Sequence, residues 1–230
     1  MHINDDLKSL YESWKNIGEP QGLIDEPTYK ASKPRIVLLG KELNEKRRNF
    51  KNLFTFMETE IKKGQKGKSF SKQPKQVGLW AYGILKGFPD YSKLTDLNLN
   101  ICAAEGLKSI GWTNVKKPGG KGKAVDAEIK RYAEKQFYLW IKELEIMDPQ
   151  VILFAGTYNI ASSLFLLGSR LETKFILPKC RYSVWQLHGH DCLCVDFYNP
   201  GYWGSYQKSY QHLAAIFNEC KKQGLCNWMK

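Results

Sequence analysis

The chain has 230 residues, of which 43% are hydrophobic and 13% aromatic, a composition typical of a globular protein with one domain. No apolar run approaches the roughly 18 residues that a membrane-spanning helix needs, so we expect no membrane partner. Thirty-five Lys and Arg against 23 Asp and Glu give a net charge of +12, which favours a polyanionic partner, nucleic acid first. An ordinary basic enzyme is the alternative that charge alone leaves open.

The start of the chain indicates the cellular compartment, and the cysteines indicate whether a metal is bound. The opening segment MHINDDLKSLYESW lacks the positive and apolar regions of a signal peptide, so we expect a cytoplasmic protein. The six cysteines include no C-x-x-C pair, which favours free thiols over disulfides or a zinc site. His188 and His190 have no third ligand near them, and we interpret them as turn residues. We therefore expect no metal and no other cofactor.

The first third of the chain contains a helix, a strand and a basic segment. Apolar residues at three- and four-residue spacings predict a helix over residues 3–16, and we expect residues 1–30 to form an N-terminal helical extension. The run IVLLG at 36–40 predicts a strand buried on both faces. Residues 41–76 are polar and basic, most densely at 62–75, and indicate a loop or a phosphate-contacting surface.

The rest of the chain alternates helical and strand patterns. A second apolar run that ends in glycine, VILFAG at 151–156, is followed by a helical pattern. Two strand-to-helix units of this kind predict a parallel sheet and the α/β fold class. In chain order we expect a helix turning into a loop at 77–111, a strand at 112–115, a basic turn at 116–123, a helix at 126–146, a strand at 151–156, a helix at 157–167, a strand at 192–197 and a helix at 206–223.

Three separated segments, each at a predicted strand end, resemble motifs of the uracil-DNA glycosylase superfamily. Residues 40–44 (GKELN) resemble its water-activating loop, with Glu42 at the acidic position and leucine in place of the usual proline. Residues 113–119 (TNVKKPG) resemble the strand that carries the base-reading asparagine, here Asn114. Residues 197–203 (FYNPGYW) resemble the His-Pro-Ser loop in the form of the mismatch-specific branch, which has Asn for His.

The resemblance spans residues 34–220 and implies both a fold and an activity. The implied fold is a three-layer α/β/α sandwich with a mainly parallel central sheet. Residues 112–167 are similar to the iron–sulfur branch, but the cysteines of that branch are missing, so we expect no cluster. The implied activity is hydrolysis of the N-glycosidic bond of a flipped-out uracil, deaminated or modified pyrimidine base in DNA.

The resemblance also implies a role for each loop. Glu42 orients water and offsets positive charge on the sugar, Asn114 reads the base edge, and Asn199 donates to the base oxygen. The plainer interpretations are a solvated glutamate and two asparagines in turns. The implied base-binding residues are Gly40, Asn44, Phe50, Phe54 and Asn114, with one phenylalanine stacked on the base. The implied DNA-binding residues are Lys116, Lys117, Lys121 and Lys123 at phosphates and Tyr202 and Trp203 as a wedge in the duplex.

The sequence thus predicts a monofunctional DNA glycosylase that acts on DNA as a monomer. A phage-defence glycosylase that excises a bulky modified cytosine is the alternative within the same fold. Two alternatives come from other classes of protein. A catalytically silent nucleic-acid-binding module would keep the fold and the positive charge, and a nuclease would hold magnesium with Glu42 and Asp196.

Overall fold

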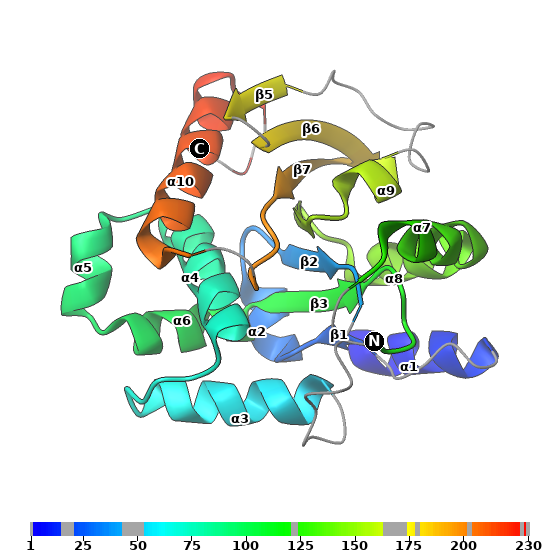
Figure 1. Ribbon diagram of the computed structural model, residues 1–230, viewed down its shortest axis with the longest axis horizontal. Helices are drawn as coiled ribbons and strands as arrows, with labels where there is room; N and C mark the ends of the chain where they lie inside the picture. Colours follow the sequence, from blue (N-terminus) through cyan, green and yellow to red (C-terminus); the bar gives the residue numbers. More distant parts are fainter. Residues whose placement is uncertain are drawn as a thin grey trace.

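A mixed sheet of seven strands lies at the centre of the described part of the chain (Figure 1). The computed structural model describes residues 2–14, 21–42, 53–120, 124–162, 174–177, 180–201, 204–225 and 228. The strands follow the order β1-β3-β2-β4-β7-β6-β5 across the sheet. Their bounds are β1 (Gly22–Leu23), β2 (Ile36–Gly40), β3 (Ile110–Asn114), β4 (Val151–Ala155), β5 (Lys174–Leu177), β6 (Cys180–Leu187) and β7 (His190–Phe197).

The pairing directions divide the sheet into a parallel centre and antiparallel flanks. β2 runs parallel to both β3 and β4, and β4 runs parallel to β7. β1 pairs antiparallel with β3, and β6 pairs antiparallel with β7 and β5. The expected α/β class is confirmed, but the sheet is mixed, and parallel pairing is limited to the centre. The carboxyl ends of the parallel strands meet at one edge, where ligands bind in open α/β sheets.

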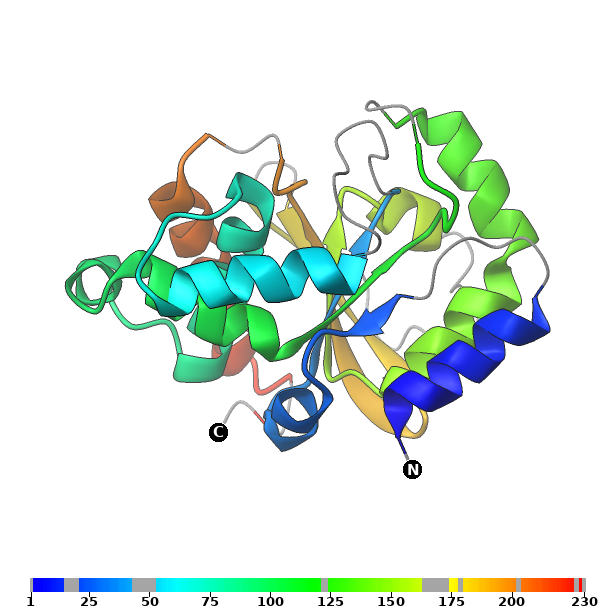
Figure 2. The ribbon, with the colours of Figure 1, turned by 90° about the horizontal axis from the view of Figure 1, so that it is seen from below.

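Helices cover both faces of this sheet. They are α1 (Ile3–Ser13), α2 (Glu26–Ala31), α3 (Leu53–Gln65), α4 (Lys72–Lys86), α5 (Tyr91–Asp96), α6 (Leu99–Lys108), α7 (Asp126–Lys135), α8 (Phe137–Met147), α9 (Tyr158–Ser162) and α10 (Tyr206–Lys222). Ile36 and Leu38 of β2 belong to a core cluster with α3, α4, α6 and α10. Val37 and Leu39 belong to a second cluster with α1, α2, α7 and α8. Figure 2 shows α3, α4, α6 and α10 on one side of the sheet and α1, α7 and α8 on the other.

Several elements lie where the sequence predicted them. β2 has the expected bounds, and β4 differs from its prediction only by the last glycine. β3 and β7 each begin two residues before the expected strand. α10 ends one residue before its expected end at 223. The helix expected at 3–16 is present as α1 but ends at Ser13, because Trp14 already has an extended backbone. The helix expected at 157–167 is present as α9, and residues 163–167 lie outside the described chain.

The sequence analysis predicted a loop or a phosphate-contacting surface at 41–76. The loop prediction is wrong, because the segment contains α3 and the start of α4. Leu53, Met57 and Ile61 recur at four-residue spacing on α3, and all three are buried. This spacing places them on one face of a helix, while the lysines of the segment occupy the other faces. Because lysine is so frequent in this segment, the apolar residues at helical spacing were not recognised as an amphipathic helix.

Other expectations about local structure are also corrected. The helix expected at 126–146 is two helices, α7 and α8, which meet at Gln136. The loop-like part of 77–111 contains α5 and α6. The extension at 1–30 is not wholly helical, because β1 lies within it and joins the sheet. β5 and β6, which extend the sheet beyond β7, were not predicted as strands.

The Glu26 carboxylate, in α2, connects this helix to the start of α1. It accepts hydrogen bonds from the N–H groups of Ile3 at 2.8 Å and Asn4 at 3.0 Å. It also pairs with Lys30 at 2.5 Å. Burial alone would raise the pKa of Glu26, but these partners outweigh burial and lower the pKa to about 2.

We expect Glu26→Gln to lower the free energy of unfolding by about 1–2 kcal/mol at neutral pH, since it removes a charged cap from α1. A depressed folded-state pKa contributes stability above the ordinary value of 4.5, and this contribution is lost as the pH falls toward 2. Between these pH values the variant should therefore lose stability less steeply than the wild type. Urea titrations followed by circular dichroism measure both slopes, and equal slopes would contradict the prediction.

Candidate functional site

Two loops lie side by side at the carboxyl edge of the sheet. Gly40 at the end of β2 pairs with Asn114 at the end of β3. The pairing continues beyond the strands, since the N–H of Val115 donates to the Gly40 carbonyl at 2.9 Å. The N–H of Lys116 donates in turn to the Lys41 carbonyl, also at 2.9 Å. The structure therefore places the first two predicted motifs next to each other.

The Asn114 side chain is held in one orientation at this edge. Asn114 is 2% exposed. Its backbone N–H donates to Oε1 of Gln21 at 2.6 Å, and its Nδ2 donates to the same oxygen at 3.3 Å. A Cβ atom on Gly40 would lie 2.3 Å from Asn114 Oδ1, so glycine at this position makes room for the amide. The residue predicted to read the base is thus anchored by Gln21, which the sequence did not indicate.

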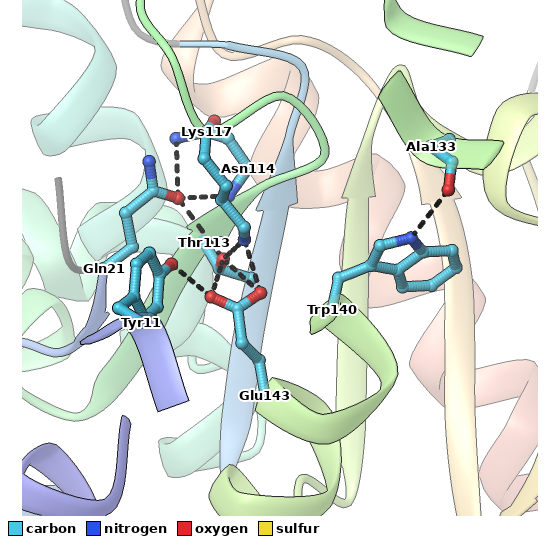
Figure 3. Close-up of polar contacts among 8 residues, drawn as sticks. All are labelled: Tyr11, Gln21, Thr113, Asn114, Lys117, Ala133, Trp140 and Glu143. Atoms are coloured by element: carbon cyan, nitrogen blue, oxygen red, sulfur yellow. Dashed lines mark hydrogen bonds and ion pairs between the residues drawn. The ribbon is translucent and has the colours of Figure 1, made fainter. Parts of the chain in front are cut away.

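A buried polar network lies beside this asparagine. Figure 3 shows its members Tyr11, Thr113, Lys117 and Glu143. Lys117 Nζ donates to Thr113 Oγ1 at 2.6 Å and to the Glu143 carboxylate. The Tyr11 hydroxyl also donates to Glu143. Burial lowers the pKa of Lys117, although the charge of Glu143 opposes this shift, and burial raises the pKa of Tyr11.

The prediction that Lys116 and Lys117 contact phosphates is wrong. The side chain of Lys117 is 0% exposed and pairs with a buried glutamate. Lys116 Nζ binds Glu42 at 2.7 Å and Glu128 at 2.8 Å, and its side chain is 7% exposed. Neither ammonium group is available to a phosphate at the protein surface. A pair of lysines that reads as a solvated basic turn is in fact part of the interior.

Glu42 faces the second loop rather than open solvent. Its side chain is 8% exposed, and its Oε2 binds Lys116. Gly120 lies against the carboxylate, since a Cβ atom there would come within 2.2 Å of both oxygens. Burial alone would lower the pKa of Lys116, but Glu128 and Glu42 outweigh burial and raise the pKa. A carboxylate–ammonium pair thus links the first two loops.

The third predicted motif lies near the first. Asn199 Oδ1 accepts a hydrogen bond from the N–H of Gly201 at 2.9 Å, the turn contact of the plainer interpretation. This contact uses the Oδ1 oxygen of the amide and does not involve Nδ2. A Cβ atom on Gly156, at the end of β4, would lie 3.6 Å from Lys41 Cε and 3.9 Å from Asn199 Cβ. Gly156 therefore lies next to both Lys41 of the first loop and Asn199 of the third.

The other predicted site residues are only partly within the described chain. Phe54 is half-buried in the first turn of α3, and its role as a stacking residue stays a prediction. Six further residues lie outside the described ranges, so their roles also stay predictions: Asn44, Phe50, Lys121, Lys123, Tyr202 and Trp203.

Metal-ligating side chains do not gather within the described ranges, where no group of three or more His, Cys, Asp or Glu residues could hold an ion. The two carboxylates of the nuclease alternative have cationic partners. Asp196 pairs with Arg181 at 2.9 Å, and Glu42 pairs with Lys116. His190, after the turn between β6 and β7, binds Asp148 at 2.6 Å. These contacts engage the two carboxylates in ion pairs and the histidine in a hydrogen bond.

Gln21 and Glu143 are the site residues that the sequence analysis missed. Glu143 carried a signal, because it lies between Trp140 and Met147 on the apolar face of α8, where a charged residue is unexpected. Gln21 carried none, because it precedes a strand of only two residues. Such a strand is too short to show alternation of apolar and polar residues.

Comparison with known proteins finds no relative. No family model, no curated protein and no solved structure matches the chain. None of the helices in the described part of the chain has the length and apolar character needed to cross a bilayer. A functional assignment therefore depends on the geometry of the three loops and on the motifs they carry.

Proposed function

We propose that this chain is a monofunctional DNA glycosylase of the uracil-DNA glycosylase superfamily. The observation that carries the proposal is the meeting of three loops at the carboxyl edge of the parallel strands, which brings Glu42, Asn114 and Asn199 to one edge. Breaking an N-glycosidic bond builds positive charge on the sugar and negative charge on the base. A carboxylate and two amides are the groups that stabilise this pair of charges.

In the proposed reaction each loop has one task. The polar edge of a flipped-out uracil, deaminated or modified pyrimidine contacts Asn114, whose amide is fixed by Gln21 and Gly40. Glu42 orients the attacking water and offsets charge on the sugar. Asn199 Nδ2 donates to the base oxygen as negative charge develops there.

The ion pairs of nearby lysines support water rather than an amine as the nucleophile. A Schiff base needs a neutral amine that reaches the sugar. Lys41 binds Asp126 at 2.5 Å, and the pKa of Lys116 is raised by its two glutamate partners. Lys117 has no exposed side-chain surface. A hydrolytic, monofunctional enzyme therefore fits the described lysines better than a lyase.

The test is base release from a panel of DNA oligonucleotides and phage genomes that carry different bases, with mass spectrometry of the released bases. We expect one class of pyrimidine to be released, with abasic sites left in the DNA and activity retained in chelator. Release of bulky modified cytosine alone would favour the phage-defence alternative. Strand breaks that appear without alkali and vanish with chelator would favour a nuclease.

A catalytically silent nucleic-acid-binding module is the second candidate, and one observation favours it. The carboxylate that should orient water is 8% exposed and bound to Lys116. A neutralised, covered carboxylate is a poor general base unless substrate binding rearranges the pair. Salt-sensitive DNA binding without base release from any oligonucleotide would support this candidate.

We also propose that the mixed α/β arrangement is the three-layer α/β/α sandwich of this superfamily. The support is the pair of core clusters on opposite faces of the sheet. We also propose a cytoplasmic monomer. Sedimentation of the purified protein at micromolar concentration measures its oligomeric state, and a stable dimer would contradict the monomer.

The turn between α3 and α4 is the basic surface that we propose for the DNA backbone. The turn and the ends of the two helices beside it carry four exposed lysines, here called the α3–α4 lysines: Lys62, Lys66, Lys68 and Lys72. The end of this turn lies close to the Asn199 loop. A Cβ atom on Gly201 of that loop would lie 2.5 Å from Nε2 of Gln73, which is in the first turn of α4. DNA held on this turn would pass beside the Asn199 loop.

Replacing the α3–α4 lysines together by Ala should weaken DNA binding regardless of sequence. Because fewer counterions are released, the slope of log K against log salt should shrink by about 2 to 4. Fluorescence anisotropy at several salt concentrations measures this slope. The control is Ala at Lys33, Lys93, Lys221 and Lys222, four exposed lysines away from the turn. Equal effects of both sets would show a response to net charge alone.

A further inference from the structure

Gln21 presents a buried amide nitrogen that has no partner within the described residues. Gln21 is 1% exposed, and its Nε2 atom is buried without a hydrogen bond there. A buried donor left unpaired costs about 1–3 kcal/mol, so such groups in folded proteins call for an explanation. Its neighbour is Asn114, the residue at the centre of the proposed site.

The orientation of the Gln21 amide follows from its partners. The Asn114 N–H group lies 2.6 Å from one amide atom of Gln21, and the Asn114 Nδ2 group lies 3.3 Å from the same atom. Both groups are donors, so the atom between them must be the acceptor Oε1. A flipped amide would place three donors together. Nε2 is therefore the atom on the unpartnered side.

We propose that Gln21 is a second specificity-determining residue of the site, whose Nε2 donates a hydrogen bond to a carbonyl oxygen of the same flipped base that Asn114 contacts. Figure 3 shows the two side-chain amides next to each other, both directed away from Glu143. A ligand oxygen at this position would satisfy the unpaired donor. The inference rests on the proposed function for the existence of the site, but not on catalysis.

The two amides together define the chemistry of the group they bind. Gln21 Nε2 and the second hydrogen of Asn114 Nδ2 are donors, and Asn114 Oδ1 is an acceptor. Two donors can converge on the two lone pairs of one carbonyl oxygen, while the acceptor takes an adjacent ring N–H. The pair therefore fits a base edge in which a ring N–H adjoins a carbonyl, and it does not fit the amino edge of cytosine.

Binding rather than cleavage tests this role. The probes are duplex oligonucleotides with one 2′-fluoroarabino nucleotide, whose fluorine opposes cleavage by disfavouring positive charge on the sugar. The bases are uracil, thymine, hypoxanthine and cytosine, and a tetrahydrofuran abasic site is the reference. The ratio of the affinity for each base to that for the abasic site, from fluorescence anisotropy, measures base-specific binding.

Gln21→Glu keeps an oxygen for the Asn114 N–H and removes the donor. We expect it to reduce the ratio for the best carbonyl base about tenfold, with little change for the abasic duplex. Gln211→Glu, on an exposed residue of α10, adds the same charge and should leave the ratio unchanged. Asn114→Ala should also reduce the ratio, and thermal unfolding checks that each variant is folded.

A change in the probe gives the same test without a change in the protein. Sulfur is a weak acceptor, so the 2-thio or the 4-thio analogue of uracil should bind the wild type several-fold less tightly than uracil does. The role of Gln21 is overturned if neither analogue weakens binding, if Gln21→Glu keeps the wild-type ratio, or if the wild type distinguishes no base from the abasic site. The last two results would leave a structural water as the partner of Nε2. A catalytically silent module could still bind the base more tightly than the abasic site. The binding role of Gln21 can therefore be tested separately from catalysis.

Discussion

Glu42→Gln should slow single-turnover base release by at least about 100-fold, while DNA affinity stays level or rises slightly. General-base catalysis contributes about 10²- to 10⁴-fold, and the amide removes the charge while keeping nearly the same shape. Affinity can rise because a negative charge near the phosphate backbone is removed. Rapid-quench measurement of base release with enzyme in excess of substrate isolates the chemical step from product release.

Glu128→Gln is the matched control for this prediction. Glu42 and Glu128 bind the same Lys116 Nζ, at 2.7 Å and 2.8 Å, so each variant removes one of its two anionic partners. If Glu42 serves only to pair with Lys116, both variants should have similar effects. A loss confined to Glu42→Gln assigns the effect to chemistry. Wild-type rates in Glu42→Gln would leave the silent module as the better interpretation.

Lys117→Met should have the largest effect on stability of any substitution considered, a loss of about 3–5 kcal/mol in the free energy of unfolding. The change leaves Glu143 in the interior with its charge uncompensated, since both side chains of the pair are 0% exposed. Urea denaturation measures the loss. A double variant with Glu143→Gln removes both charges and should recover a large part of it.

Lys142→Met provides the comparison for Lys117→Met. Lys142 is also paired with a glutamate, at 2.5 Å, but its side chain is 61% exposed. Surface ion pairs contribute about 0–1 kcal/mol, so this variant should unfold close to the wild type. Equal effects of the two substitutions would mean that burial of Lys117 does not determine the cost.

The central strands could be predicted from the sequence because their signal is local. β2 ends in glycine and β4 is followed by one, and both are short continuous apolar runs. A short run bounded by glycine is typical of a strand buried on both faces rather than of a helix. The same local patterns predicted that Asn114 and Glu42 lie at the ends of strands. Parallel pairing then brings those ends to one edge, so the neighbourhood of the site followed from the order of elements.

The contacts inside the site could not be predicted in this way. Lysine is rarely buried, so residues 116 and 117 read as a solvated turn. Their burial depends on Glu143, Glu128 and Glu42, which approach them only in the folded chain. The hydrogen bond between Asn114 and Gln21 joins two segments that are distant in the sequence, and neither local pattern predicts the contact. Tertiary contacts of this kind override the preference of each residue for the surface.

The distance along the chain between partners at the site affects when it can form during synthesis. Tyr11 and Glu143 are 132 positions apart, and Gln21 and Asn114 are 93 positions apart. Contacts between such distant residues form late, because a long loop must close first. Tyr11 and Gln21 are synthesised long before Glu143 and Asn114, their partners at the site. A nascent chain that stops short of α8 would hold Lys117 without its carboxylate.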